Sequence, residues 1–271
     1  MTHQTDAAHA VPSTDPRHAA APAWSLEAAW AESEADVRAA QALRFAVFAG
    51  ELGARLPPDA LASGLDADRF DPACDHLLVW ANDAAGVQAR TLVGTYRVLP
   101  AQAACRLGGL YAEQEFDLAA LAPLRPRMVE LGRACVHPDF RSGGVILTLW
   151  SALGRYMLRR EFDTMVGCAS VGLADGGAFA SALWHALRAR HLAPPPWRAT
   201  PHTPLALHGE SDLCPPLPLR AMPPLIKGYL RGGATVLGAP AYDAGFHTAD
   251  LPIMLRLQDL SARYRKQFLL P

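Results

Sequence analysis

The alternation of apolar and polar residues along the chain predicts an α/β fold. Apolar residues recur at intervals of three and four over residues 34–52, which predicts an amphipathic helix ended by Gly53. Two runs rich in β-formers follow, at residues 76–81 and 90–99, and the N-D-A-A-G turn between them predicts a hairpin. The interval at 57–75 contains proline, glycine and five aspartates, and we interpret it as a loop that closes over a site.

A strand, a helix and a second strand are predicted at residues 128–137, 145–160 and 164–171. This order predicts parallel pairing of the two strands through a right-handed crossover. The pattern also predicts a helix at 179–190, an irregular proline-rich connection at 194–224, a short helix ended by two glycines, a strand at 246–257 and a last helix at 259–270. The first 24 residues contain few large apolar side chains, so we expect a disordered tail followed by one domain, 25–271.

Composition narrows the class of protein. With 51% hydrophobic residues in 271, the chain is long enough for one sizeable core, and a formal net charge of −1 argues against a nucleic-acid binder. The five cysteines form no C-x-x-C pair, which predicts neither a zinc site nor a disulfide framework and favours a reducing cytoplasm. We found no secretory leader and no apolar run of the roughly 18 to 20 residues that cross a bilayer.

Charged residues in the central strand are the first candidates for chemistry. Glu130 and Arg133 lie inside an apolar run, where a charge is costly unless it is paired or functional. Burial would raise the pKa of Glu130, which suits a general base; the alternative is a structural ion pair with Arg133. Residues three apart on a regular strand face opposite sides, so that pairing requires a β-bulge.

The turn after this strand predicts an anion site. Arg141, Gly143 and Gly144 precede a helix whose first N–H groups are unpaired and point toward the turn. Arg155, Arg159 and Arg160 on that helix either face an acidic partner or form a solvated surface.

A strand followed by R-x-G-G and a helix resembles the acyltransferases of the GNAT superfamily, although the usual signature, R-x-x-G-x-G/A, is longer. The string E-L-G-R-A-C-V-H-P-D-F-R from Glu130 to Arg141 resembles the branch that takes acyl groups from acyl carrier protein, and in particular the ornithine-lipid N-acyltransferases. The resemblance implies a mixed, mostly antiparallel twisted sheet flanked by helices, with a parallel β-α-β core. It also implies that Arg141, Gly143 and Gly144 hold the phosphopantetheine phosphate.

That branch is similar to the acyl-homoserine-lactone synthases, whose polar cluster can be carried over residue by residue. The resemblance implies that the following residues form the catalytic and substrate-binding cluster: Arg44, Phe48, Asp68, Asp71, Arg97, Glu130 and Arg133. As a hypothesis, Asp68 or Asp71 holds the side-chain ammonium of the acceptor.

Further strings resemble the ornithine-lipid branch, and the likeness covers about residues 38–256. They are C-D-H-L-L-V at Cys74, V-G-T-Y-R at Val93, Y-A-E-Q-E-F-D-L at Tyr111, G-C-A-S at Gly167 and L-I-K-G-Y-L-R at Leu225. Five residues toward the C-terminus are candidates for the acceptor or acyl end of the site, without assigned roles: Lys227, Tyr229, Arg231, Asp243 and Asp250.

The resemblance implies an enzyme that transfers a fatty acyl group, 3-hydroxylated in this branch, from acyl carrier protein to the α-amine of L-ornithine. No metal and no permanently bound cofactor are expected. The partners are acyl carrier protein, L-ornithine and, through Arg263, Arg265 and Lys266, the inner membrane surface; the alternative for that last segment is a helix packed on the sheet. Three rival functions remain open: a lactone synthase, an N-acyltransferase for glycine, glutamine or lysine, and a non-catalytic carrier-protein or membrane-binding module.

Overall fold

The computed structural model describes residues 24–83, 90–209 and 222–269. The expected disordered tail lies outside the described residues apart from Trp24, which begins a strand that the sequence pattern did not predict. The centre of the predicted hairpin turn, residues 84–89, and residues 210–221 of the proline-rich connection also lie outside them.

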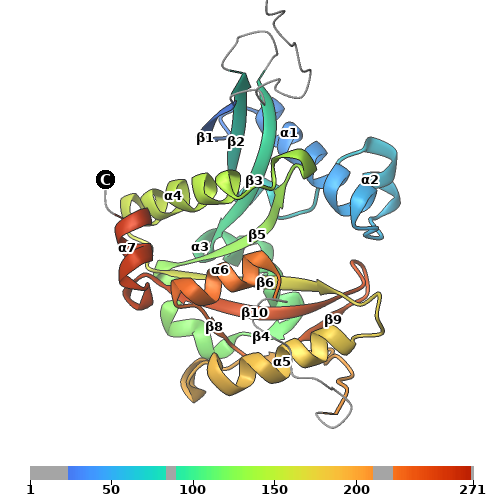
Figure 1. Cartoon of the computed structure of the whole chain (residues 1–271), viewed down its shortest axis with the longest axis vertical. Coiled ribbons are helices and arrows are strands. Elements are labelled where there is room, and N and C mark those ends of the chain that lie inside the picture. The colour runs from blue at the N-terminus through green and yellow to red at the C-terminus, as the bar shows by residue number, and fades with distance from the viewer. Residues whose placement is uncertain (1–23, 84–89, 210–221, 270–271) are drawn as a thin grey trace, which may run out of the picture.

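An eight-stranded sheet organises the domain (Figure 1). Its order is β1-β2-β3-β5-β6-β10-β8, with β9 beside β10. The strands are β1 (Trp24–Trp30), β2 (Asp75–Asp83), β3 (Thr91–Pro100), β5 (Met128–Val136), β6 (Thr164–Gly172), β8 (Thr235–Val236), β9 (Ala241–Asp243) and β10 (Thr248–Arg256). Two short strands, β4 (Phe116–Asp117) and β7 (Thr200–Pro201), form a separate pair. Within the large sheet only β5 and β6 run parallel, so the predicted fold class is confirmed.

The longer helices lie where the apolar periodicity predicts them. The helices are α1 (Glu34–Phe45), continued by the π-helical η2 (Ala46–Glu51), then α2 (Pro58–Ser63), α3 (Ala101–Ala104), α4 (Gly144–Arg159), α5 (Ala178–Arg190), α6 (Pro224–Gly232) and α7 (Ala262–Phe268). The 3-10 turns are η3 (Asp71–Ala73), η4 (Cys105–Leu107), η5 (Tyr111–Gln114), η6 (Ala119–Arg127), η7 (Pro138–Phe140), η8 (Pro195–Trp197) and η11 (Leu257–Asp259). The predicted loop at 57–75 is therefore partly helical, through α2 and η3. No helix among the described residues is long and apolar enough to cross a bilayer.

The two central strands separate soon after they start. β5 and β6 each have nine residues but pair at only three positions, the last being Glu130 with Val166. Beyond this point β5 is paired with β3 alone and β6 with β10 alone. The parallel pairing predicted from the sequence is thus confirmed, and it leaves a gap between two halves of the sheet.

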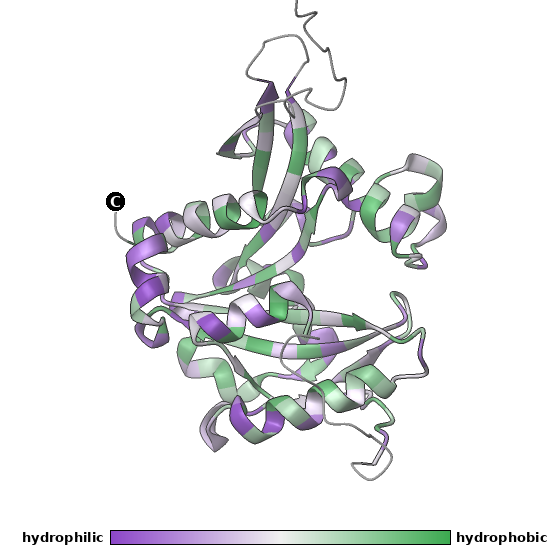
Figure 2. Cartoon of the chain, viewed as in Figure 1, coloured by the Kyte–Doolittle hydropathy of each residue, from purple (hydrophilic) through white to green (hydrophobic). Residues whose placement is uncertain are grey.

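Side chains on the central strands alternate between two apolar cores on opposite faces. On one face Val129 and Val98 pack against Leu149 and Leu153 of α4. On the other face Met128 joins a core built from α3, β4 and the 3-10 turns. Figure 2 shows hydrophobic residues along the strands, whereas α7 is largely hydrophilic.

The last helix packs against the domain through its apolar end. Phe268 is buried, and its ring lies edge-on to Trp150 of α4, with centroids 5.8 Å apart. Arg263, Arg265 and Lys266 remain exposed. Of the two interpretations left open by the sequence, the structure favours a packed helix with a basic outer surface.

Candidate active site

A buried arginine on the first helix holds together the segment that follows it. Arg44 has no exposed surface; its Nε donates to Asp66 at 2.9 Å, and its Nη2 donates to both carboxylate oxygens of Asp71 at 3.0 Å. Gln41, one turn earlier on α1, also donates to Asp71. Because a buried charge is tolerated only when it is paired, this network fixes the segment over the sheet.

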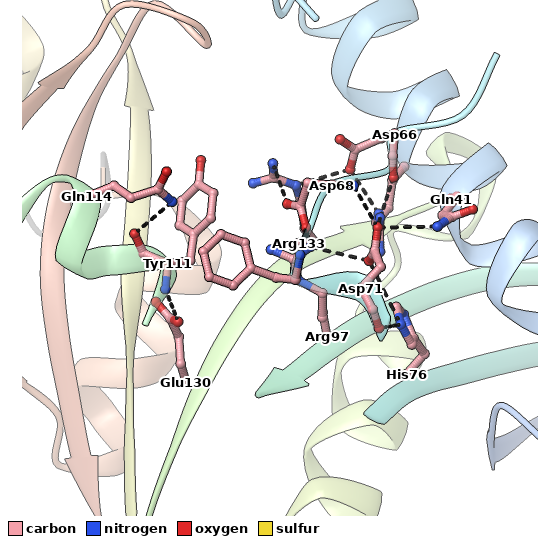
Figure 3. Close-up of polar contacts among 12 residues, drawn as sticks. Gln41, Asp66, Asp68, Asp71, His76, Arg97, Tyr111, Gln114, Glu130 and Arg133 are labelled. Atoms are coloured by element: carbon pink, nitrogen blue, oxygen red, sulfur yellow. Dashed lines mark hydrogen bonds and ion pairs between the residues drawn. The ribbon is translucent and has the colours of Figure 1, made fainter. Parts of the chain in front are cut away.

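Two further arginines from the sheet complete the network (Figure 3). Arg97 of β3 donates to Asp68 at 2.7 Å and contacts Asp71 at 3.3 Å, while Arg133 of β5 donates to Asp66 at 3.1 Å. Burial raises the pKa of Asp71, but its arginine neighbours outweigh that effect and hold the pKa below its usual value. Asp68 and Asp71 therefore already have cationic partners within the protein.

The β-bulge anticipated from the sequence is present in β5. Gly132 pairs with Arg97 and Cys135 pairs with Thr95, so β5 has one residue more than β3 across this interval. Arg133 lies in it with a φ of 52°, a left-handed conformation that is costly for a residue with a side chain. The guanidinium carbon of Arg133 lies 4.9 Å from the ring centroids of both Tyr111 and Phe246.

Glu130 does not form the ion pair with Arg133 that was its alternative interpretation. Its two carboxylate oxygens accept hydrogen bonds from the backbone N–H groups of Tyr111 and Ala112, at 2.6 and 2.7 Å, where η5 begins. Glu130 is 4% exposed, and burial raises its pKa to about 7 although both hydrogen bonds favour the charged form. A carboxyl group that titrates near neutrality suits a general base.

A second acidic group lies beyond Tyr111 and forms no ion pair within the described part of the chain. Glu115, Cys168 of β6 and Asp250 of β10 place their polar atoms within 4.8 Å of one another. The Oε2 atom of Glu115 is buried without a hydrogen-bond partner in the described part of the chain. Burial, together with Asp250 and Asp243, raises the pKa of Glu115 to about 9. Burial also raises the pKa of Asp250.

The turn that the sequence predicts as an anion site lies at the start of α4. Gly143 adopts a φ of 101°, which glycine tolerates, and it caps the helix that begins at Gly144. Arg141 turns away from the helix and forms two hydrogen bonds with Glu51 of η2, at 2.5 and 2.7 Å. The guanidinium group of Arg141 is therefore already paired with a carboxylate within the protein.

An apolar pocket lies on the α4 side of the gap between β5 and β6. Its walls come from β5, β6, β10, α4, α6 and α7, and none of its lining residues carries a charge. Cys168 lines this pocket and also belongs to the second acidic group, so the pocket and the polar cluster meet at the gap.

The residues predicted to form the polar cluster are largely brought together. Phe48 packs edge-on against Phe246, and the centroids of these two rings are 6.0 Å apart. The Phe246 ring in turn lies against the guanidinium group of Arg133. Of the α6 candidates, Tyr229 lines the apolar pocket, whereas Arg231 is exposed and Lys227 lies outside the pocket lining.

Several residues of the site were missed by sequence reasoning. Asp66 bridges Arg44 and Arg133, and His76 bonds the carbonyl of Asp71 at 3.0 Å. Glu115 and Tyr111 belong to a string that the sequence singled out for its resemblance, yet only the fold brings that string against β6 and β10. A strand-and-helix pattern has no local signal for this contact.

Fold and site together define an N-acyltransferase of the GNAT superfamily: two central strands separate, a bulge lies where they diverge, a buried carboxyl group lies beside it, and a glycine turn begins the helix that follows. The family model described as an acetyltransferase (GNAT) domain matches residues 43–151. The chain belongs to the L-ornithine N(alpha)-acyltransferase family. It is 40% identical to the member from Brucella abortus, covering 89% of this chain and 87% of that one, and 38% identical to the member from Rhodobacter capsulatus, covering 92% and 96%.

Solved structures agree with this fold. The crystal structure of TofI in a ternary complex with an inhibitor and MTA aligns with a TM-score of 0.51 at 16% identity, covering 90% of this chain and 97% of TofI. A CoA-dependent acyl-homoserine lactone synthase, BjaI, with MTA aligns with a TM-score of 0.50 at 16% identity, covering 92% and 91%. At this identity the likeness concerns the fold alone.

Proposed function

We propose that this protein transfers a fatty acyl group from the phosphopantetheine arm of acyl carrier protein to the α-amino group of L-ornithine. The assignment of ornithine as the acceptor rests on relatives that are 37–40% identical over about nine tenths of the chain. These relatives share the name L-ornithine N(alpha)-acyltransferase. The turn at Arg141, the gap between β5 and β6 and the apolar pocket behind it support a long-chain thioester donor.

The two faces of the sheet suit the two substrates. The thioester arm extends from the start of α4 into the gap, and the acyl chain occupies the apolar pocket, which has no charged residue to exclude it. Glu130 and Arg97 project to the opposite face, where the acceptor binds. The reacting atoms then meet at the bulge in β5.

The reaction needs the acceptor amine without its proton. Glu130 takes a proton from the α-ammonium group, directly or through water, and the freed nitrogen attacks the thioester carbonyl. The C–N bond forms and the C–S bond breaks. The nitrogen then gives up a second proton, which passes directly or through water to the departing sulfur, so the carrier leaves as a thiol. The bulged backbone of β5 is the candidate donor to the carbonyl oxygen during this step.

We assign the side-chain ammonium of ornithine to Glu115 and Asp250. Asp68 and Asp71, the earlier hypothesis, already face arginines. Glu115 and Asp250 have raised pKa values, and the Oε2 atom of Glu115 is buried and unpartnered among the described residues. An ammonium group placed there would compensate both carboxylates.

Acyl carrier protein is the proposed donor rather than coenzyme A, and the cytoplasm is the proposed location. Arg155 and Arg159 are exposed on α4 and offer a basic surface to an acidic carrier. The basic face of α7 offers a peripheral contact with the anionic inner membrane, into which a single-chain lipid product would pass.

The test is a reconstituted assay with acyl carrier protein loaded with a fatty acyl group, acyl-coenzyme A for comparison, and a panel of amino acids, with products identified by mass spectrometry. We expect N-acylornithine from the carrier-bound donor. Glu130→Gln is expected to lower the rate by roughly 10²–10⁴-fold. Wild type is expected to show a rise in rate with pH near pH 7, and the variant is expected to lack it. A folded variant, checked by thermal melting, that keeps this pH dependence would contradict the assignment of Glu130 as the base.

A further inference from the structure

The turn between β9 and β10 contacts the segment that follows η2. The two strands pair up to Asp243 and Thr248, and residues 244–247 form the turn. The backbone N–H of Arg55 donates to the carbonyl oxygen of Gly245 in this turn, at 2.9 Å. In Figure 1 the turn is the end of the β9–β10 pair that lies nearest to α2. The bond joins the half of the sheet that contains β6 and β10 to the chain that continues from α1, which packs on β3.

Phe246 is the residue of this turn that packs against the rest of the protein. It is half-buried, whereas the other three residues of the turn are exposed. Its ring belongs to an apolar cluster with Leu56 and Phe48. The same ring lies 4.9 Å from the guanidinium carbon of Arg133, and the Tyr111 ring lies at an equal distance from that carbon. The charged end of Arg133 is therefore held against two rings from separate parts of the chain.

Asp243 gives the turn its shape. Its Oδ1 atom accepts hydrogen bonds from the backbone N–H groups of Gly245 and Phe246, at 2.7 and 3.0 Å. The turn also contains His247 with a φ of 53°, a left-handed conformation that is costly for a residue with a side chain. Because the two hydrogen bonds stabilise this conformation, Asp243 fixes the direction in which Phe246 points.

The two rings connect the turn to the groups proposed to bind and activate the acceptor. Tyr111 donates its backbone N–H to Glu130 at 2.6 Å. Arg133 lies in the bulge of β5 with a φ of 52°, and such a conformation persists only where the surroundings hold it. A shift of Phe246 therefore disturbs both the bulge and the residue that supports Glu130.

We propose that Phe246 and Asp243 are positioning residues for the acceptor: Phe246 holds Arg133 and closes the outer side of the acceptor site, and Asp243 holds Phe246. This inference rests on the proposed function, since it assumes that the acceptor binds on this face of the sheet. The turn also begins beside the second acidic group. Burial raises the pKa of Glu115, and the charges of Asp250 and Asp243 raise it further.

The first experiment measures KM for ornithine and for the carrier-protein donor in two variants of the ring. Phe246→Leu keeps an apolar side chain in the cluster but removes the ring, and it is expected to raise the KM for ornithine by roughly five- to tenfold. The KM for the donor is expected to stay within about twofold of wild type, because the donor enters from the other face. Phe246→Tyr retains the ring and is expected to restore the KM for ornithine.

Phe179→Leu is the matched control, because Phe179 is a half-buried ring that packs on a core outside the site. An unchanged KM for ornithine in Phe246→Leu would overturn the inference, and so would an equal rise in Phe246→Tyr or in the control. Thermal melting of each variant separates loss of positioning from loss of folding.

The second experiment follows hydrogen–deuterium exchange at the Arg55 amide, which needs no turnover. Asp243→Asn keeps a side-chain oxygen that accepts from the turn, and its exchange is expected to match wild type. Asp243→Ala removes that acceptor, and the amide is expected to exchange roughly tenfold faster. Equal exchange in the two variants would overturn the role of Asp243. If wild type transfers no acyl group to ornithine, the proposed function is contradicted, and the exchange measurement still tests the turn.

Discussion

At the scale of single residues, the site contains two kinds of buried or partly buried carboxyl group. Asp66, Asp68 and Asp71 face arginines and act as permanent ion-pair partners. Glu115 and Asp250 face each other, and both have raised pKa values. The first kind orders the protein by itself, whereas the second kind remains strained in its charged form until a cation arrives.

This difference predicts how stability depends on pH. The pKa of Glu115 is near 4.5 when unfolded and about 9 when folded, so between these values the unfolded chain has released a proton that the folded chain still holds. The free energy of unfolding therefore falls as pH rises from about 5 to about 9. Glu115→Gln removes the titrating group and with it this fall in the free energy of unfolding. The variant is expected to be more stable than wild type at pH 8 by more than ~1 kcal/mol, with little difference at pH 5.

Denaturant unfolding at pH 5 and pH 8, without ornithine, measures this prediction. Glu113→Gln is the control, because Glu113 is only two residues away and pairs with Arg125. If wild type were instead more stable than Glu115→Gln by a margin that grows with pH, the assignment of a strained carboxyl group at this position would be contradicted.

At the scale of elements, the gap between β5 and β6 depends on how closely the strands approach where they part. A Cβ atom on Gly167 would lie 2.3 Å from the carbonyl oxygen of Leu131, which is backbone and cannot move aside easily. On the same strand, a Cβ atom on Gly172 would meet nothing within 4 Å. The two glycines therefore provide a matched pair.

Gly167→Ala is expected to destabilise the protein by roughly 1–3 kcal/mol and to lower acyl transfer, because the added methyl group forces the strands apart at the mouth of the pocket. Gly172→Ala is expected to stay within about 0.5 kcal/mol of wild type. Thermal or denaturant unfolding combined with the transfer assay measures both. Equal stability and equal acyl transfer in the two variants would contradict this prediction, because they would show that β5 and β6 can move further apart at no cost.

The sequence predicted the elements with strong periodicity and missed those without it. The helix at 34–52, the hairpin and the central strand, helix and strand are present with small changes in bounds. β8 and β9 have two and three residues, too few for a periodic pattern, and they exist because β10 offers an edge. The sequence predicts no strand at β1, whose first residue falls in the expected tail, although β1 pairs along its whole length with β2.

Only those residues of the polar cluster that match the motifs of a known family could be predicted from the sequence. Arg44, Arg97 and Arg133 could be found in this way, but their partner Asp66 could not, because an aspartate in an acidic loop has no distinguishing local pattern. The same holds for Glu115, whose partners Cys168 and Asp250 are 53 and 135 positions away and meet it only in the folded sheet.

At the scale of the whole molecule, the ion pair between Arg141 and Glu51 links the turn proposed to bind the donor to the segment proposed to cover the acceptor. Glu51 ends η2, and the chain then continues into α2 and the aspartate segment. A phosphate that binds Arg141 must displace the carboxylate of Glu51. Donor binding and the position of this cover are therefore coupled through one guanidinium group.

Glu51→Gln is expected to lower the KM for the acyl carrier protein donor by a factor of roughly two to five, because the phosphate no longer competes with a carboxylate at an exposed pair. Arg141→Gln is expected to raise that KM, with the effect shrinking at high salt. Steady-state kinetics at two salt concentrations measures both changes. A higher KM in Glu51→Gln would mean that Glu51 contacts the carrier instead of opposing the phosphate.

We propose that this GNAT-fold acyltransferase selects ornithine by pairing its side-chain ammonium with Glu115 and Asp250. The most direct measurement is the ratio of kcat/KM for ornithine to that for norvaline, which has the same carbon chain without the terminal amine, in wild type, Glu115→Gln and the control Glu113→Gln. We expect a ratio of roughly 100 or more in wild type and in the control, and a ratio that falls at least tenfold in Glu115→Gln. A wild-type ratio near one, or a Glu115→Gln ratio equal to that of wild type, would contradict the account.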